Sequence, residues 1–213
     1  MVRTLEQMPP AFAPAAGPWR PIDPPRARAL LAGVASPWWI AGGWAIDLFL
    51  GHRSRGHKDL DVGILRPATL EVLAALPDWE FFEAQGGMLF HLATGTAPRA
   101  AVNSLWARPK GSSTWELEFL LNDSIDDRLV FRRAPQITLP LAQAIRHHPD
   151  GIVYLTPEFQ LLYKARPPLR TEDQADFDSV APHLGAAAAN WLRQALELTD
   201  PQHPWLQHAA LAR

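Results

Sequence analysis

The chain contains no cysteine among its 213 residues. Disulfide bonds and thiolate metal sites are therefore excluded, and the composition is one expected of a cytoplasmic protein. No run of about 18 apolar residues is present, so no membrane-spanning segment is expected. The first residues lack a basic stretch followed by an apolar run, so no secretory signal peptide is predicted either.

Neither sign of charge is in large excess, since the formal net charge is -2. The balance gives no indication of general DNA binding, although a local basic cluster can still bind a small anion. The Gly-x-Ser-x-Gly motif of serine hydrolases and the Gly-x-x-x-x-Gly-Lys-Ser/Thr motif of P-loop proteins are both absent. What is present is a globular composition with 47% hydrophobic residues, long enough for one large domain or two small ones.

The hydrophobic pattern divides the chain into three parts. Residues 1–24 are rich in proline and alanine and are predicted to form an extended N-terminal arm. Residues 25–135 alternate between helical and strand patterns, which predicts an α/β (α+β) domain with a mixed sheet flanked by helices. Residues 136–213 are predicted to form a helical C-terminal region. Its expected helices cover residues 139–147, 157–165, 172–184 and 186–198, with a last helix near 204–211.

A pair of glycines marks the segment of greatest functional interest. A buried strand predicted over residues 38–41 ends at Gly42-Gly43, and a helix predicted over residues 44–50 follows. Because glycine has no Cβ, a phosphate can approach the backbone N–H groups and the positive end of such a helix. The loop over residues 52–58 then supplies basic side chains that suit a triphosphate: His52, Arg53, Arg55, His57 and Lys58.

Two aspartates follow this basic loop. Asp59 and Asp61 begin an alternating pattern that predicts a half-buried strand over residues 59–65. Residues two apart on a strand project from the same face, about 7 Å apart along it. Their carboxylates can share Mg²⁺ with water and phosphate oxygens. Two such ions about 4 Å apart stabilise both oxygens of an in-line displacement, and three carboxylates hold such a pair better than two.

The third acid is expected on a strand predicted over residues 114–121. Glu116 and Glu118 share one face of that strand by alternation, opposite Leu117 and Phe119. Glu118 is favoured because it lies deeper in the apolar run, and Glu116 is the second candidate. The alternative is that both are solvent-facing residues of an edge strand.

Together these residues resemble the active-site signature of minimal nucleotidyltransferases of the polymerase-beta-type superfamily. They are most similar to its aminoglycoside and lincosamide nucleotidyltransferase-like branch. The signature consists of Gly42 to Asp47, then Arg53, Arg55, His57, and Asp59 to Val62. A weaker similarity extends through Arg132-Arg133, Tyr154 to Glu158, Leu161 to Lys164, Asp173, Asp176-Phe177 and Trp191-Leu192.

The resemblance implies a Mg²⁺-dependent transfer of a nucleoside monophosphate, AMP from ATP in the favoured case, onto a hydroxyl of a small molecule such as an antibiotic. It implies that Asp59 and Asp61 hold Mg²⁺. Glu118 or Glu116 would complete the metal site or accept the hydroxyl proton. Lys164 would face either the nucleotide or Asp173. The implied nucleotide-binding residues are Gly42, Gly43, Arg53, His57 and Lys164.

Two other functions stay open at this stage. One is a non-catalytic nucleotide-binding or regulatory protein of the same fold, because related enzymes often carry aspartate where this chain has its candidate glutamates. The other is a toxin–antitoxin component that nucleotidylates a protein or tRNA. A transition-metal site around His52 and His57 is disfavoured, because these residues lack the helical i,i+4 spacing of zinc proteases. The expected partners are a nucleoside triphosphate and a small hydroxyl acceptor, with no DNA and no membrane.

Overall fold

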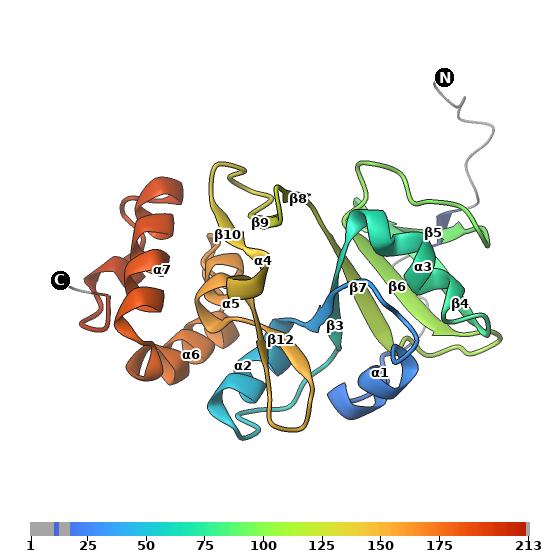
Figure 1. Cartoon of the computed structure of the whole chain (residues 1–213), viewed down its shortest axis with the longest axis horizontal. Helices are drawn as coiled ribbons and strands as arrows, with labels where there is room; N and C mark the ends of the chain where they lie inside the picture. Colours follow the sequence, from blue (N-terminus) through green and yellow to red (C-terminus); the bar gives the residue numbers. More distant parts are fainter. Residues whose placement is uncertain (1–10, 13–17, 212–213) are drawn as a thin grey trace. The chain divides into compact units, whose positions relative to one another are not determined.

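The computed structural model describes residues 11–12 and 18–211. Most of the arm predicted over residues 1–24 therefore lies outside the described residues. The chain groups into two compact units, of which the first contains Met1–Ile40 and Gly56–Asp123. The second contains Ala41–Arg55 and Ser124–Arg213 (Figure 1). The domain boundaries expected after residues 24 and 135 stay predictions.

The first unit is built on a mixed sheet, as predicted. Its strands lie in the order β1-β5-β4-β6-β7-β3-β2. They are β1 (Ala11–Phe12), β2 (Trp38–Ile40), β3 (Asp61–Leu65), β4 (Trp79–Gln85), β5 (Met88–Leu92), β6 (Ser104–Pro109) and β7 (Leu117–Asn122). Strands β3 and β7 are parallel, and the other neighbouring pairs are antiparallel. Strands β4, β6 and β7 can be followed side by side in Figure 1.

Alternation of apolar residues explains the position of β3 and β7 inside this sheet. Val62 and Ile64 of β3 and Phe119 of β7 are fully buried, as is Leu60 just before β3. Helices α1 (Pro24–Leu30) and α3 (Thr69–Ala74) belong to the same unit, and the 3-10 turn η2 (Arg66–Ala68) leads into α3. The core of the first unit therefore lies directly beneath the strands that carry the acidic motif.

Gly63 of β3 lies opposite Trp39 of β2. A Cβ on Gly63 would come within 2.1 Å of Trp39 Nε1, and Trp39 is only 1% exposed. We expect Gly63→Ala to displace the indole and to lower the free energy of unfolding by about 1–3 kcal/mol. Urea denaturation measures this loss. The double variant Trp39→Leu with Gly63→Ala should lose less than the sum of the single losses; strict additivity would contradict the steric explanation.

The second unit combines helices with short strands. Its helices are α2 (Gly42–Leu50), α4 (Leu141–Ala144), α5 (Pro157–Lys164), α6 (Thr171–Val180) and α7 (Ala186–Thr199), with 3-10 turns η3 (Ala181–His183) and η4 (Pro204–Gln207). Strands β8 (Ser124–Ile125), β9 (Arg128–Val130) and β10 (Thr138–Pro140) form one small sheet, and β11 (Ile145–His147) pairs with β12 (Val153–Leu155).

Helix α5 is the centre of the second unit, because it contacts α2, α6 and α7. Its Phe159 ring stacks on Trp191 of α7, with ring centroids 5.4 Å apart. A second stack joins Phe177 of α6 to Trp205 of η4, with centroids 4.2 Å apart. These aromatic pairs assign two of the chain's nine tryptophans, Trp191 and Trp205, to packing within the second unit. No helix among the described residues is long and apolar enough to cross a membrane.

The helix predicted over residues 139–147 is wrong for most of its length. Only Leu141–Ala144 is helical, and the flanking residues belong to β10 and β11. Strand β11 is stabilised by its pairing with β12, which follows several residues later, so the local periodicity of residues 139–147 could not reveal it. The predicted helices after residue 157 are confirmed as α5, α6 and α7, whereas the last one is reduced to the short turn η4.

Candidate active site

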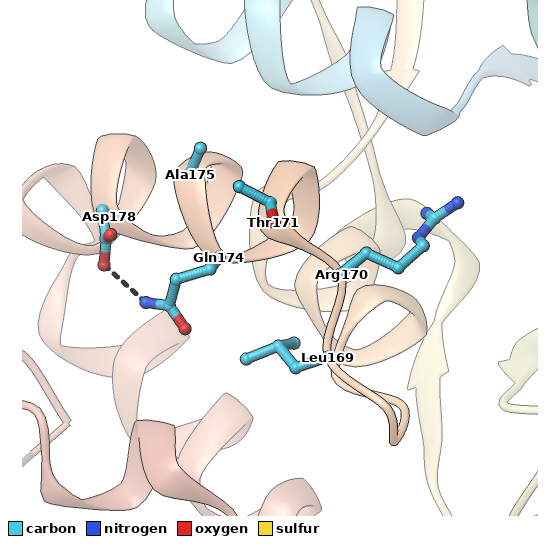
Figure 2. A pocket seen from close by; sticks show the side chains of 6 residues that line it. All are labelled: Leu169, Arg170, Thr171, Gln174, Ala175 and Asp178. Carbon is cyan, nitrogen blue, oxygen red and sulfur yellow. Dashed lines mark hydrogen bonds between the residues drawn. The ribbon is translucent and has the colours of Figure 1, made fainter.

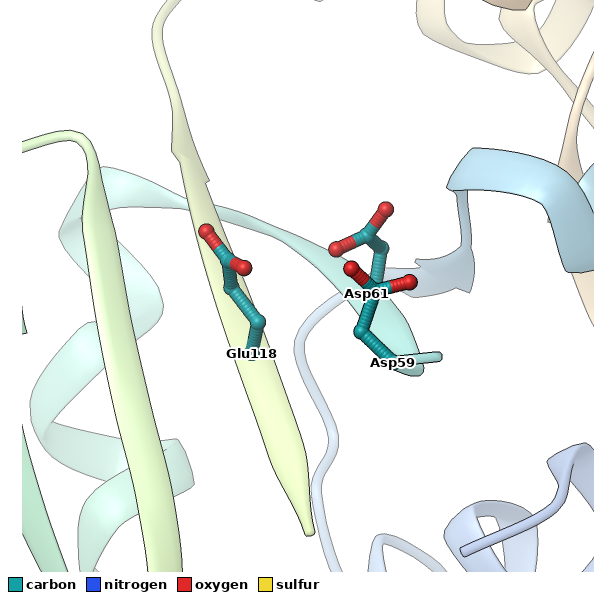
Figure 3. A group of neighbouring side chains, drawn as sticks. All are labelled: Asp59, Asp61 and Glu118. Carbon is teal, nitrogen blue, oxygen red and sulfur yellow. The ribbon is translucent and has the colours of Figure 1, made fainter. Parts of the chain in front are cut away.

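Three carboxylates come together in the first unit. Strands β3 and β7 are parallel neighbours, with Asp61 directly opposite Glu118. Asp59 lies in the loop just before β3, so the strand predicted over residues 59–65 begins two residues later than expected. One oxygen of each of Asp59, Asp61 and Glu118 lies within 4.8 Å of the other two. Figure 3 shows the three side chains gathered on the same side of the two strands.

Glu118 forms hydrogen bonds with residues of both neighbouring segments. Its backbone N–H donates to the carbonyl of Leu60 at 2.9 Å, which aligns β7 with the start of β3. The Ser104 hydroxyl of β6 donates to Glu118 Oε1 at 2.6 Å. Burial is the main cause that raises the pKa of Glu118, and the negative charge of Asp59 raises it further. Hydrogen bonds from the side chains of Ser104 and Trp106 lower the pKa and oppose part of this rise.

Glu116, the second candidate for the third acid, lies outside this group. Its N–H donates to the carbonyl of Ala107 at 3.1 Å, although Leu117 is already the register partner of Ala107. Two residues therefore face one, which is a β-bulge, and a bulge interrupts the alternation from which a shared face was predicted. Among the described residues, the acid group contains Glu118 and not Glu116.

Gly42 and Gly43 open helix α2 of the second unit, as the sequence predicted. Gly42 has a φ of 64°, which explains why a residue without Cβ is needed there. Its N–H donates to Oε1 of Gln160 in α5 at 2.9 Å. The amide of Gly42 is thus engaged within the protein.

Side chains of helix α2 contact the loop that follows it. Asp47 accepts hydrogen bonds from the N–H of Ser54 at 3.0 Å and from its hydroxyl at 2.5 Å. The guanidinium carbon of Arg53 lies over the Trp44 ring, 5.4 Å from its centroid, and Arg53 Nε donates to the carbonyl of Arg55. The predicted basic loop therefore has a defined conformation, set by an acid and an aromatic residue of the motif helix.

Lys164 is buried in the second unit and faces two aspartates of α6. Its Nζ lies 2.7 Å from Asp176 Oδ2 and 3.2 Å from Asp173 Oδ1. Arg55 binds Asp176 through two nitrogens, both at 3.1 Å, and Arg170 binds Asp173 at 2.6 Å. Of the two predicted orientations, the one towards Asp173 is observed. Burial alone would raise the pKa of both aspartates, but the hydrogen bonds and positive charges of their partners hold each pKa below its usual range.

Glu158, in the first turn of α5, is 7% exposed, and its carboxyl Oε2 has no hydrogen-bond partner among the described residues. Burial raises its pKa, so the folded state binds this proton more tightly than the unfolded chain. The resulting stabilisation is complete at acidic pH and is lost as pH rises above the ordinary glutamate range. We expect Glu158→Gln to make the free energy of unfolding fall less steeply with rising pH and to increase it by about 1–3 kcal/mol near pH 8. Urea denaturation midpoints measured across the pH range test this prediction. The same dependence of the midpoint on pH in the variant and the wild type would contradict it.

A surface hollow of about 440 Å³ lies at the start of α6 in the second unit. Figure 2 shows the residues that line it: Leu169, Arg170, Thr171, Gln174, Ala175 and Asp178. It contains none of the predicted catalytic or nucleotide-binding residues, so it does not guide the functional assignment.

Comparison with known proteins places these features in context. Residues 26–86 match the family of aminoglycoside-2''-adenylyltransferases. The matched segment runs from α1 into β4 and includes Gly42, Gly43, Asp59 and Asp61. No curated protein sequence matches the chain.

Two solved structures share the fold. ANT(2'')-Ia, solved in complex with adenylyl-2''-tobramycin, is similar with a TM-score of 0.55 and 19% sequence identity, over 80% of this chain and 92% of that one. The lincosamide antibiotic adenylyltransferase LnuA, solved with lincomycin bound, is similar with a TM-score of 0.52 and 18% identity, over 73% of this chain and 92% of that one. The family match confirms the predicted resemblance to the aminoglycoside nucleotidyltransferases, and the two solved structures share the fold.

Proposed function

We propose that this chain, a nucleotidyltransferase similar to the aminoglycoside and lincosamide enzymes, transfers AMP from ATP to a hydroxyl of a small ring-containing antibiotic. The observation that carries the proposal is the group formed by Asp59, Asp61 and Glu118. A non-catalytic protein of the same fold has no need of a third carboxylate beside the aspartate pair. The presence of Glu118 in the group therefore favours catalysis.

The proposed reaction is a displacement at the α-phosphorus of the triphosphate. The acceptor oxygen forms a bond to the α-phosphorus, while the bond from that phosphorus to the bridging oxygen breaks and pyrophosphate leaves with the bonding electrons. The hydroxyl proton passes to a carboxylate or to water. A carboxylate whose pKa is raised by burial is the better proton acceptor, and Glu118 has this property.

The acid group fits Mg²⁺ by its chemistry. Three carboxylates with oxygens within 4.8 Å of one another provide the hard oxygen ligands that this ion prefers. When bound, Mg²⁺ would neutralise charge that develops on the phosphate oxygens. Asp59 and Asp61 would hold the ion, and Glu118 would complete the group. On the sequence resemblance, Gly43, Arg53 and His57 stay predicted nucleotide contacts, whereas the Gly42 amide donates to Gln160 and Lys164 binds Asp173 and Asp176 instead.

The test is a labelling experiment with the full chain. The protein is incubated with Mg²⁺, α-labelled ATP, and either tobramycin, lincomycin, total tRNA or a protein extract. Label on an antibiotic, with release of pyrophosphate, is the expected result. Label on tRNA or protein instead would favour the toxin-like function. Binding of ATP without any labelled product would contradict the enzyme proposal.

A further inference from the structure

Helix α2 begins without a cap of its own. The residue before it is Ala41, whose methyl side chain makes no capping hydrogen bond. Helices usually begin after serine, threonine, aspartate or asparagine, because the side-chain oxygen of such a residue accepts from the second or third N–H of the helix. In α2 the second N–H belongs to Gly43. A local cap is therefore missing at the turn that the sequence resemblance assigns to triphosphate binding.

A residue of another helix supplies an acceptor instead. Oε1 of Gln160, in α5, accepts from the N–H of Gly42 at 2.9 Å. Gly42 is buried and Gln160 is only 5% exposed, so this hydrogen bond is shielded from water. It engages the first N–H of α2 and does not occupy the N–H of Gly43. The positive end of the helix is thus stabilised in a way that leaves its second N–H to an anion.

The hydrogen bond from Gly42 also fixes the conformation of the turn. Gly42 has a φ of 64°, and an unconstrained glycine samples many other conformations. A buried N–H must be paired, so the Gln160 oxygen favours the one orientation in which the Gly42 N–H points at α5. The next peptide unit joins Gly42 to Gly43, and its orientation depends on φ and ψ of Gly42. The direction of the Gly43 N–H is therefore set by Gln160.

The same face of α5 supports the other end of the motif segment. Lys164 follows Gln160 by one turn, so both side chains project from one face of the helix. Lys164 binds Asp176 of α6 at 2.7 Å, and Asp176 binds Arg55 through two nitrogens at 3.1 Å. Gln160 thus fixes the start of the segment 42–55, and Asp176 fixes its end. All of these residues belong to the second unit.

We propose that Gln160 is a positioning residue for the triphosphate, which caps α2 from α5 and so directs the Gly43 N–H to the phosphates without occupying it. A backbone N–H only donates, so Nε2 of Gln160 is left as a second donor beside the same turn. A carboxylate in its place would accept the same hydrogen bond but repel the phosphates. This inference rests on the proposed nucleotidyl transfer and adds a residue outside the matched segment 26–86.

The variant Gln160→Glu separates the cap from its effect on the nucleotide, because glutamate keeps an acceptor for Gly42 but adds a negative charge. Calorimetry measures binding of ATP and of tripolyphosphate, each with Mg²⁺, to the wild type, Gln160→Glu, Gln160→Ala and Gln143→Glu. We expect both Gln160 variants to weaken binding of both ligands about tenfold. Gln143→Glu adds the same charge to an exposed residue of α4 and should change binding less than about twofold.

Two further measurements show how Gln160 acts. Hydrogen exchange of the Gly42 amide should stay slow in Gln160→Glu and become faster in Gln160→Ala, because only the alanine removes the acceptor. KM for ATP should rise more than kcat falls, since the acid group is untouched. If Gln160→Ala does not fold, Gln160→Met keeps the length of the side chain without the acceptor and takes its place.

The outcomes distinguish this inference from the proposed function. Unchanged ATP binding in a folded Gln160→Ala variant overturns the inference. Unchanged binding in Gln160→Glu with a protected Gly42 amide also overturns it, and so does equal weakening in Gln143→Glu. ATP binding that depends on Gln160, but without any labelled product, would sustain the inference and contradict the proposed transfer. Labelled product with ATP binding independent of Gln160 would do the reverse, and absence of ATP binding in the wild type overturns both.

Discussion

Replacement of Glu118 by glutamine is expected to lower kcat for nucleotide transfer by about 10³-fold, because removal of one charged ligand or proton acceptor from such a site costs several kcal/mol of transition-state stabilisation. Glutamine keeps the size of the side chain and an oxygen that can accept the Ser104 hydrogen bond. The fold should therefore be retained, which circular dichroism and urea denaturation verify. Label transfer from ATP to the best acceptor of the panel measures the rate.

Glu116→Gln is the matched control for this prediction. Glu116 lies two residues away on the same segment but outside the acid group, so its replacement should change kcat less than about threefold. The pair of variants decides between the two glutamates that the sequence left open. A large loss for Glu116→Gln with a small loss for Glu118→Gln would contradict the assignment of the third acid.

Replacement of Asp176 by alanine is expected to lower the free energy of unfolding by about 3–5 kcal/mol, because it leaves the buried Lys164 ammonium without its nearest partner. Asp176 is 3% exposed and binds both Lys164 and Arg55. The same change removes the Asp176 partner of Arg55, which belongs to the loop after α2. Urea or guanidinium denaturation measures the loss.

Glu197→Ala provides the control for the Asp176 variant. Glu197 forms an ion pair with Arg193 at 2.6 Å, but its side chain is 47% exposed. Only the Glu197 end of this pair is solvated; Arg193 is 8% exposed but keeps its hydrogen bond to Asn190, so the expected loss is less than about 1 kcal/mol. Equal losses in the Asp176 and Glu197 variants would show that the Lys164 cluster is no more stabilising than a surface pair.

Elements that depend on interactions between neighbours along the chain were predicted well, and elements that depend on distant segments were not. The Gly42-Gly43 start of α2 and the strand that carries Asp61 were predictable because they depend on neighbours along the chain. Strands β11 and β12 were not, since each is stabilised by the other and neither has a strong pattern of its own. Lys164 illustrates an intermediate case, because its apolar helix was evident but its two aspartate partners belong to another helix.

The sequence alone determined which chemical groups were available: two aspartates two residues apart, glycines before a helix, and two glutamates on a nearby strand. The identity and spacing of these groups can be read from the sequence, because they depend only on the order of residues along the chain. Only the tertiary structure brings Glu118, and not Glu116, close to the aspartates, because a bulge opposite Ala107 breaks the alternation and the parallel register of β3 and β7 places Glu118 beside Asp61. It also placed Trp106 next to Glu118, since register between strands depends on packing and hydrogen bonds that no single segment contains.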